Sequence, residues 1–207
     1  MYHLITTKGC GSAIVEAALE LSGLSYEVEE LDYETPGPGR DRLRSINPLG
    51  QVPTLLLPDG ALMTESAAMI LHITDRCPEA GLAPPADDPS RPAFLRWLIF
   101  LVAAIYPTFT YGDDTSRWVD GETAGNRLKA ATNQRREAMW HYVEAQLAPD
   151  PWMLGERFSA LDLYVSVMTH WRPRRPWFAD HCPKLSRVAL RVDAMPRLAE
   201  VWVRNFG

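Results

Sequence analysis

Hydrophobic and polar residues follow two different periods along the first part of the chain. Short runs rich in β-branched and aromatic residues predict strands, whereas apolar residues three and four positions apart predict helices. The pattern indicates strands at 2–6, 26–31, 54–57 and 61–64, and helices at 13–21, 41–46 and 66–76. The predicted order is therefore β-α-β-α-β-β-α. The Asp59-Gly60 turn makes the last two strands an antiparallel hairpin, while the first two strands, joined through a helix, should run parallel.

The rest of the chain has a different pattern. Residues 78–92 contain five prolines among small and acidic residues, which is typical of a linker. Helical spacing follows at 94–106, 122–147, 159–170, 183–192 and 196–204. The first of these helices is apolar except for Arg96, so we expect it to be buried on most sides. The second should carry its charged residues on the outside.

These patterns predict an α/β domain with a thioredoxin-type order of elements, followed by an all-α domain. We place the first domain at residues 1–78, the linker at 79–92 and the helical domain at 93–207. Ser159 and Asp162 match a capping box at the start of the third predicted helix of the second domain. That pairing fixes where the third helix should begin.

Composition narrows the classes of partner. The 207 residues are 46% hydrophobic and 23% charged, with a net charge of −5, which disfavours nucleic acid and anionic membranes as partners. Prolines interrupt the basic residues Arg172, Arg174 and Arg175, and we interpret this segment as a solvated connector. No leader-like pattern opens the sequence. The uncharged stretch 97–112 is short and contains Pro107, so no membrane span is expected.

The cysteines and histidines suggest a reducing compartment and no metal site. Three cysteines, Cys10, Cys77 and Cys182, form no CxxC pair, which favours a cytoplasmic protein over a disulfide framework. The five histidines show no metal-ligand spacing, so we expect no bound metal.

Cys10 is the candidate reactive residue. It lies between the first strand and the first helix, in the segment Lys8-Gly9-Cys10-Gly11-Ser12. A thiol at a helix N-terminus should have a lowered pKa, and Lys8 should lower it further. Ser12 is expected to cap the helix, and its hydroxyl is a second candidate for stabilising a bound thiolate. The alternative for Cys10 is a small residue in a tight loop.

Two short blocks indicate a pocket for a peptide-like ligand. Residues 47–53 read Asn-Pro-Leu-Gly-Gln-Val-Pro, and the bond before Pro53 is a candidate for the cis form. Glu65 and Ser66 start a predicted helix, where free backbone N–H groups and side-chain oxygens meet. Such a site can hold a small peptide by its main chain and its charged end.

These blocks, with the Asp59-Gly60 hairpin, resemble the glutathione transferase family over nearly the whole chain. The resemblance implies that glutathione is bound as a co-substrate by Gln51, Val52, Pro53, Glu65 and Ser66. The backbone of Val52 would pair with the cysteinyl residue, Glu65 would face the ammonium group, and Ser66 would bind the γ-glutamyl carboxylate. Helix capping is the alternative role for the last two.

The same resemblance leaves the catalytic group open. No tyrosine lies where the tyrosine-type classes carry one, so the chain is more similar to the beta, theta and zeta classes. The alignment there is ambiguous by one residue, and we expect Cys10 to act, with Ser12 as the second candidate. A hydroxyl or backbone N–H could stabilise the glutathione thiolate. Alternatively, Cys10 could form a mixed disulfide with glutathione.

The resemblance also implies a hydrophobic substrate site between the domains, and a dimer. We expect Tyr106, Phe109, Tyr111 and Trp171, with Trp118 as a further candidate, to line that site; the alternative is that these aromatic residues belong to the core. Asp162 should serve folding. The leading interpretation is a cytoplasmic, homodimeric detoxification enzyme that conjugates small hydrophobic electrophiles. The alternatives are a thiol-exchange enzyme, lyase or isomerase on this fold, and a non-catalytic binding module.

Overall fold

A four-stranded sheet forms the centre of the first half of the chain. The computed structural model describes residues 1–148 and 150–207. The strands are β1 (Tyr2–Thr6), β2 (Tyr26–Glu30), β3 (Thr54–Leu56) and β4 (Leu62–Met63), in the spatial order β2-β1-β3-β4. β1 is parallel to β2 and antiparallel to β3, and β3 is antiparallel to β4. The predicted strand directions are confirmed.

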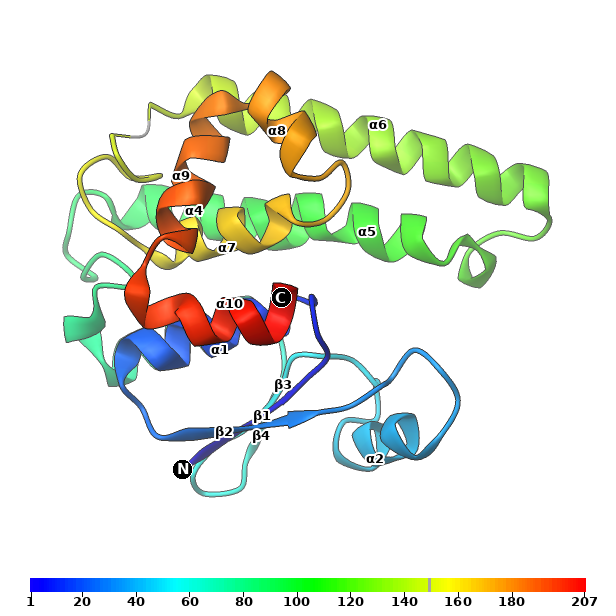
Figure 1. Ribbon diagram of the computed structural model, residues 1–207, viewed down its shortest axis with the longest axis horizontal. Helices are drawn as coiled ribbons and strands as arrows, with labels where there is room; N and C mark the ends of the chain where they lie inside the picture. Colours follow the sequence, from blue (N-terminus) through cyan, green and yellow to red (C-terminus); the bar gives the residue numbers. More distant parts are fainter. Residues whose placement is uncertain (149) are drawn as a thin grey trace.

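Three helices complete this half in the predicted order. They are α1 (Ser12–Ser22), α2 (Pro38–Ile46) and α3 (Ser66–Arg76). Gly23 ends α1 with a left-handed φ of 69°, which a residue without a Cβ adopts at no steric cost. α1 lies between the sheet and the helical half, as Figure 1 shows, and it is buried on nearly every side. The thioredoxin-like arrangement is thus confirmed.

The segment predicted as a linker packs against the second half. It contains a short 3-10 turn, η1 (Pro78–Ala80), followed by the buried residues Leu82 and Ala83. The backbone N–H of Ala160 donates a hydrogen bond of 2.7 Å to the carbonyl oxygen of Leu82. This stretch is therefore anchored at the start of a core helix. The domain boundaries at residues 78 and 93 remain a prediction.

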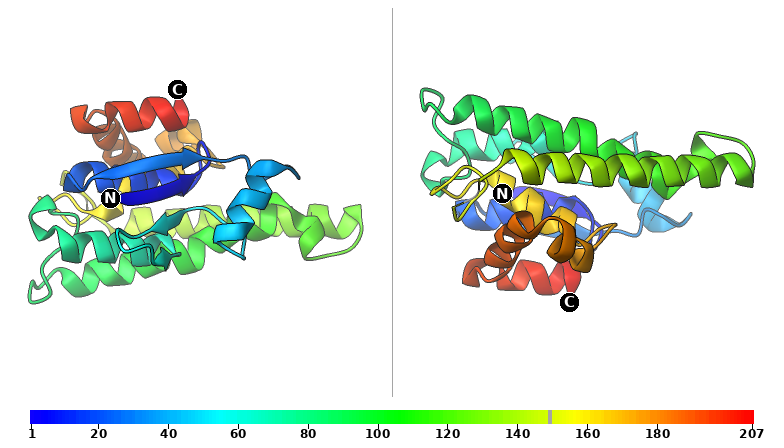
Figure 2. Two further views of the ribbon diagram at one scale, coloured as in Figure 1. Left: turned by 90° about the horizontal axis from the view of Figure 1, so that it is seen from below. Right: turned by 90° about the horizontal axis from the view of Figure 1, so that it is seen from above.

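The second half is helical. It contains α4 (Arg91–Phe100), the π-helical turn η2 (Leu101–Ile105), α5 (Tyr106–Asp113), the 3-10 turn η3 (Thr115–Arg117), α6 (Glu122–Gln146), α7 (Ala160–Thr169), α8 (Arg175–His181), α9 (Pro183–Asp193), the 3-10 turn η4 (Pro196–Leu198) and α10 (Ala199–Phe206). α5 and α6 run side by side and extend past the sheet (Figure 2). The capping box is present: Ser159 caps α7 and the Asp162 side chain accepts from the N–H of Ser159 at 2.7 Å.

The continuous helix 91–113, formed by α4, η2 and α5, has one buried and one exposed face. By length and hydropathy it is the single candidate membrane span among the described residues, a property that core helices share. Phe94, Trp97 and Leu98 lie in the core, but Ile99 is 52% exposed. The prediction that this helix is buried on most sides is wrong for the face that carries Ile99 and Ala103.

Of the basic residues predicted to be solvated, Arg136 is buried and Arg175 is partly buried. Arg136 of α6 is buried, where it donates to the hydroxyl of Thr108 at 2.9 Å and lies 3.9 Å from the ring centre of Phe109. Arg175 begins α8, which the sequence analysis did not predict, and pairs with Asp193 at 2.7 Å. The guanidinium group of Arg136 has polar partners, so its apolar surroundings tolerate it.

A single apolar core joins the two halves. Residues of α1 belong to the same cluster of buried side chains as residues of α7 and α10, and both of these helices contact α1. α10 lies alongside α1 in Figure 1, with the C-terminus near the loop that follows β1. The loop between β1 and α1 is therefore positioned by both halves of the chain.

Candidate functional site

The loops that carry Cys10 and Val52 meet at one end of the sheet. Cys10 follows the C-terminal end of β1. Because β3 is antiparallel to β1, with Thr54 opposite Ile5, the residues before β3 lie at that same end. Val52 and Pro53 immediately precede β3, and the peptide bond between them is cis, as predicted.

Two more segments reach the same end. Parallel pairing places Glu30 of β2 opposite Thr6, so the loop after β2 leaves beside the Cys10 loop. β4 runs antiparallel to β3 and its last residue, Met63, lies opposite Leu55. Thr64, Glu65 and Ser66 therefore follow at this end as well, and the topology places all the predicted glutathione-binding residues at the end of the sheet where Cys10 lies.

Cys10 lies in a tight loop rather than in the first turn of α1. Its backbone N–H donates to the carbonyl of Thr7 at 3.3 Å, and the left-handed φ of 69° at Gly9 lets the chain reverse. Gly11 is the N-cap of α1. The Cys10 side chain is half-buried, and its sulfur lies 3.9 Å from the hydroxyl oxygen of Tyr33.

The surroundings of Cys10 oppose ionisation of its thiol. Burial raises its pKa above the ordinary value; the Tyr33 hydroxyl acts in the opposite direction, and the negative charges of Glu34 and Asp113 add to the increase. The expectation of a lowered pKa is therefore wrong. Cys10 precedes the N-cap of α1, and the loss of hydration on burial is the largest influence on its pKa.

The Ser12 side chain is buried in the interior of the fold. Its side chain has no exposed surface, and its hydroxyl hydrogen bonds to the Thr6 hydroxyl at 2.5 Å and donates to the carbonyl of Thr7 at 3.4 Å. The prediction that it caps α1 is wrong, since Gly11 occupies that position. A hydroxyl enclosed in this way has no surface to offer a bound thiolate, so Cys10 remains the candidate.

Aromatic residues of the helical half contact the Cys10 loop. The indole N–H of Trp171 donates to the carbonyl of Gly9 at 2.6 Å. The Tyr106 hydroxyl lies against Gly11, so close that a Cβ on that glycine would be 2.2 Å from the phenol oxygen. Tyr106 and Phe109 each pack edge-on against Trp171, with ring centres 5.2 Å apart. The structure thus brings together three of the four predicted substrate-site aromatics.

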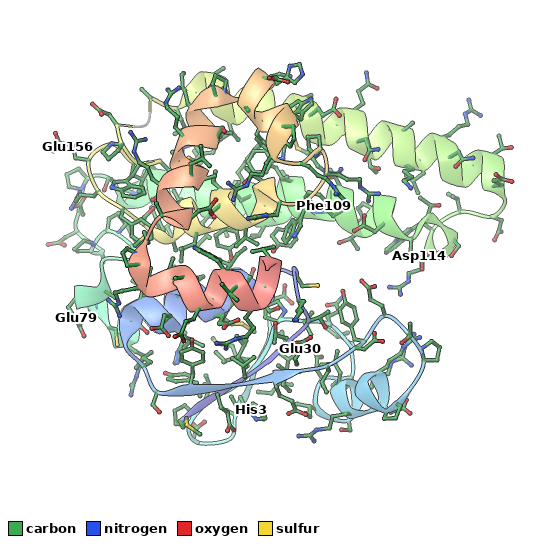
Figure 3. The ribbon with its side chains drawn as sticks, in the orientation of Figure 1. His3, Glu30, Glu79, Phe109, Asp114 and Glu156 are labelled. Atoms are coloured by element: carbon green, nitrogen blue, oxygen red, sulfur yellow. The ribbon has the colours of Figure 1, made fainter. Side chains whose placement is uncertain are left out.

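Tyr111 does not join this cluster. It lies five residues after Tyr106 on α5, which turns its side chain about 140° around the helix axis. It is 42% exposed and packs against Trp118, with ring centres 4.7 Å apart. Phe109, labelled in Figure 3, is buried between Trp171 and Arg136. The cluster therefore supports the Cys10 loop, and only the half-buried Tyr106 and Trp171 retain exposed surface.

The loop before β3 is braced by a residue whose role the sequence analysis missed. The buried Asn47 amide donates to the carbonyl of Gln51 at 3.0 Å and to the Thr54 hydroxyl at 2.9 Å, and its oxygen accepts from the N–H of Leu49 at 3.1 Å. The Thr54 hydroxyl also donates to the Gln51 carbonyl, at 2.7 Å. With that carbonyl engaged, Val52 is held in place outside the ladder that begins at Thr54.

Glu65 and Ser66 stand at the start of α3 as predicted. Glu65 is exposed and has a left-handed φ of 66°, a conformation that is strained for a residue with a side chain and that often marks functional positions. Ser66 accepts a hydrogen bond of 2.8 Å from the Tyr164 hydroxyl of α7. Tyr164 is fully buried, and nothing in its sequence pattern distinguished it from the apolar core around it.

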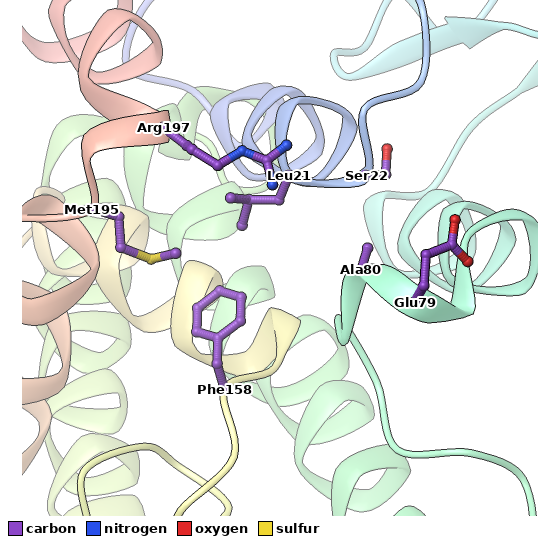
Figure 4. A pocket seen from close by; sticks show the side chains of 7 residues that line it. All are labelled: Leu21, Ser22, Glu79, Ala80, Phe158, Met195 and Arg197. Carbon is purple, nitrogen blue, oxygen red and sulfur yellow. The ribbon is translucent and has the colours of Figure 1, made fainter.

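One cavity lies away from this site. A cavity of about 400 Å³ lies at the far end of α1, where Leu21 and Ser22 end the helix (Figure 4). Its remaining lining residues are Glu79, Ala80, Phe158, Met195 and Arg197. Within residues 1–148 and 150–207, no group of three or more His, Cys, Asp or Glu side chains could hold a metal ion.

Comparisons with known proteins agree with the fold. A family model, the N-terminal domain of glutathione S-transferase, matches residues 12–76. The chain is 38% identical over 206 residues to the uncharacterized GST-like protein YncG of Escherichia coli K12, covering 99% of this chain and 98% of the relative. It is 27% identical over 207 residues to maleylacetoacetate isomerase of Pseudomonas aeruginosa, covering 92% and 90%. The crystal structure of a glutathione transferase homologue from Sulfitobacter with bound glutathione has a TM-score of 0.83 and 25% identity, covering 97% of this chain and 96% of that one.

Proposed function

The chain belongs to the glutathione S-transferase family, and we propose that it is a transferase that joins the glutathione thiol to small hydrophobic electrophiles. The observation that carries the proposal is the convergence of four segments at one end of the sheet. The half-buried Cys10, the cis Val52-Pro53 bond and the Glu65-Ser66 helix start all lie at that end. The solved homologue described above binds glutathione on the same fold.

The chemistry of glutathione matches these groups one by one. The main chain of Val52, held in place by the hydrogen bonds to the Gln51 carbonyl, offers strand-like pairing to the cysteinyl residue of the peptide. The Glu65 carboxylate suits the γ-glutamyl ammonium group, and the N-terminus of α3 with the Ser66 hydroxyl suits the carboxylate beside it. The hydrogen bond from Tyr164 orients the Ser66 oxygen. Glutathione is thus the co-substrate, held by its backbone and its charged end.

The conjugation step needs an anionic sulfur at the Cys10 loop. Glutathione bound by Val52 and Ser66 would bring its thiol near Cys10, where donors can stabilise the thiolate. The thiol proton passes to water, the sulfur forms a bond to the electrophilic carbon, and a leaving group such as halide departs. The exposed parts of Tyr106 and Trp171 are the apolar surface closest to this position.

A second candidate is thiol exchange at Cys10. The supporting observation is that Cys10 is half-exposed and within hydrogen-bonding distance of a phenol. Its raised pKa makes it a slow nucleophile at neutral pH, which favours conjugation as the main activity. The 27% identity to maleylacetoacetate isomerase keeps glutathione-dependent isomerisation as a further activity to assay.

Variants of Cys10 separate the two chemistries. We expect the wild type to conjugate glutathione to an aryl halide, and Cys10→Ser to retain at least a tenth of that rate (about 1.4 kcal/mol of barrier). Thiol exchange with oxidised glutathione should disappear in Cys10→Ser. Loss of both reactions in this variant would make Cys10 essential to conjugation, and no conjugation by the wild type would contradict the proposal.

We further propose that the protein is a cytoplasmic homodimer with a detoxifying role. The exposed face of the helix 91–113, which carries Ile99 and Ala103, supports an interface because apolar side chains there lack cover within the described chain. Sedimentation equilibrium of the wild type and of Ile99→Glu tests the dimer. The wild type should sediment as a dimer and the variant should dissociate more readily.

A further inference from the structure

Tyr33 lies on a loop that the structure holds in place from both sides. The segment after β2 is tied to β1, since the N–H of Leu31 donates to the Thr6 carbonyl at 2.9 Å. The Asp32 side chain accepts from the N–H of Glu34 at 3.0 Å and from that of Thr35 at 3.3 Å. Tyr33 is therefore presented by a fixed turn, and its ring is half-buried.

The Tyr33 hydroxyl points to the sulfur of Cys10. The 3.9 Å between the hydroxyl oxygen and Sγ is within the range of hydrogen bonds to sulfur. When the sulfur is a neutral thiol, either group can donate. When the sulfur is an anion, only the phenol has a proton to give. Burial raises the pKa of Tyr33, so the phenol keeps its proton over the pH range in which a thiol ionises.

The other groups around Cys10 oppose an anion. Glu34 on the same loop and Asp113 at the end of α5 carry negative charges toward it, and Asp113 is itself paired with Arg172. Tyr106 of α5 is neutral and its hydroxyl lies against Gly11. Among the side chains that influence Cys10, Tyr33 is the one that favours the charged sulfur.

We propose that Tyr33 is a catalytic residue whose hydroxyl donates a hydrogen bond to the anionic sulfur formed at this site. Two sulfurs can occupy that position: that of Cys10, and that of glutathione bound in front of it. The second rests on the proposed function, whereas the first does not. The chain has no tyrosine at the end of β1, and a phenol from the loop after β2 reaches the same end of the sheet.

The assistance is electrostatic in both reactions. In exchange, the Cys10 sulfur anion attacks one sulfur of oxidised glutathione, the disulfide bond breaks, and the departing glutathione thiolate takes a proton from water. In conjugation, the glutathione sulfur bonds to carbon as the leaving group departs. The phenol lowers the energy of the sulfur anion before either attack and keeps its own proton throughout.

The first arm of the test measures the ionisation of the Cys10 thiol in the absence of glutathione. Tyr33→Phe keeps the ring and removes the donor, and Tyr142→Phe removes a hydroxyl from an exposed tyrosine on α6 as the matched control. The pH dependence of iodoacetamide alkylation at Cys10 is followed by peptide mass mapping, with folding checked by circular dichroism. We expect Tyr33→Phe to raise the midpoint by about half to one pH unit, hence a three- to tenfold slower reaction below it. The control should match the wild type.

The second arm of the test measures the ionisation of the bound glutathione thiol in a Cys10→Ala background. Thiolate absorbance of the bound peptide is titrated with and without Tyr33→Phe, and the same upward shift is expected. An upward shift of the titration midpoint that occurs in Tyr33→Phe and not in Tyr142→Phe supports the proposal. A shift in the first arm identifies the Cys10 sulfur, and a shift in the second arm identifies the glutathione sulfur. Unchanged midpoints in the first arm, together with unchanged or absent glutathione titration in the second, would overturn it. Failure of glutathione to bind refutes the proposed function alone, because the first arm still decides the role of Tyr33.

Discussion

Gly11→Ala should destabilise the protein through a single contact with Tyr106. The backbone at Gly11 has φ −63° and ψ −15°, an ordinary helical conformation, so the backbone does not require glycine. A Cβ there would lie 2.2 Å from the Tyr106 hydroxyl oxygen, 3.2 Å from Cζ and 3.5 Å from Cε1. Space, rather than conformation, is what excludes alanine.

The magnitude follows from two opposing effects. Alanine in place of glycine stiffens the unfolded chain and by itself stabilises by about 0.4–1 kcal/mol. Forcing a methyl group into a packed site costs about 1–3 kcal/mol, and the Tyr106 ring has little freedom to retreat because Trp171 packs against it. The net expectation is a loss of about 1–2 kcal/mol, or roughly 2–8 °C in melting temperature for a chain of this size.

Tyr106→Phe should reverse that loss. Its hydroxyl is buried with no hydrogen-bond partner among the described residues, so removing it alone should cost little or nothing. In the double variant the nearest atom is Cζ at 3.2 Å, which a shift of a few tenths of an ångström relieves. The two changes should therefore couple by about 1–2 kcal/mol.

Urea unfolding of the wild type, both single variants and the double variant completes this cycle. The expected order of stability places Gly11→Ala alone at the bottom, with the double variant close to Tyr106→Phe. Gly11→Ala as stable as the wild type, or a double variant no better than Gly11→Ala, would refute the contact. Conjugation rates measured on the same four proteins show whether the displaced loop also disturbs Cys10.

Three further changes test contacts elsewhere in the molecule. Tyr164→Phe removes the hydrogen bond to Ser66, so the KM for glutathione should rise several-fold with kcat nearly unchanged in steady-state kinetics, and an unchanged KM would contradict the orienting role. Asn205→Ala leaves the buried Glu16 carboxylate without its 2.9 Å amide partner and should cost about 2 kcal/mol in urea unfolding; no measurable loss would count against this tie between α10 and α1. Asp162→Ala leaves the N–H groups of two capped residues unpaired and should cost about 2–4 kcal/mol, while activity per folded molecule stays constant.

The order of elements was predictable because it depends on local patterns. The Asp59-Gly60 turn and the capping box of α7 each encode their geometry within a few residues, and both predictions are confirmed. α8 was missed because it is short and begins among prolines, where the composition resembles a loop. Its first residue, Arg175, pairs with Asp193 at the end of α9, and no local sequence pattern predicts this contact.

The sequence predicted the residues expected to bind glutathione better than it predicted the environment of the candidate reactive residue. Glu65, Ser66 and the cis bond before Pro53 belong to contiguous blocks, so their placement followed from the sequence. The environment of Cys10 did not, because burial and the approach of Tyr33 arise from a different loop. A helix-dipole argument considers only the neighbouring chain, whereas burial of the thiol is the largest influence on its pKa and raises it.

The residues that support the candidate site were not predicted from the sequence, and they share one property. Asn47 forms a hydrogen bond within the loop before β3. Tyr164 of α7 forms a hydrogen bond to Ser66 of α3. Each is a polar group in buried surroundings whose partner is set by tertiary structure. Local periodicity can place such a residue in the core, and only the folded chain shows what it holds.

Calorimetric titration of glutathione into the protein tests the central claim most directly. The wild type should bind in the millimolar range or tighter. Glu65→Ala should weaken binding about tenfold or more because a charge-assisted contact is lost. Glu156→Ala, which removes an exposed carboxylate elsewhere (Figure 3), should bind like the wild type. No binding by the wild type at millimolar glutathione, or equal affinities for all three proteins, would contradict the account.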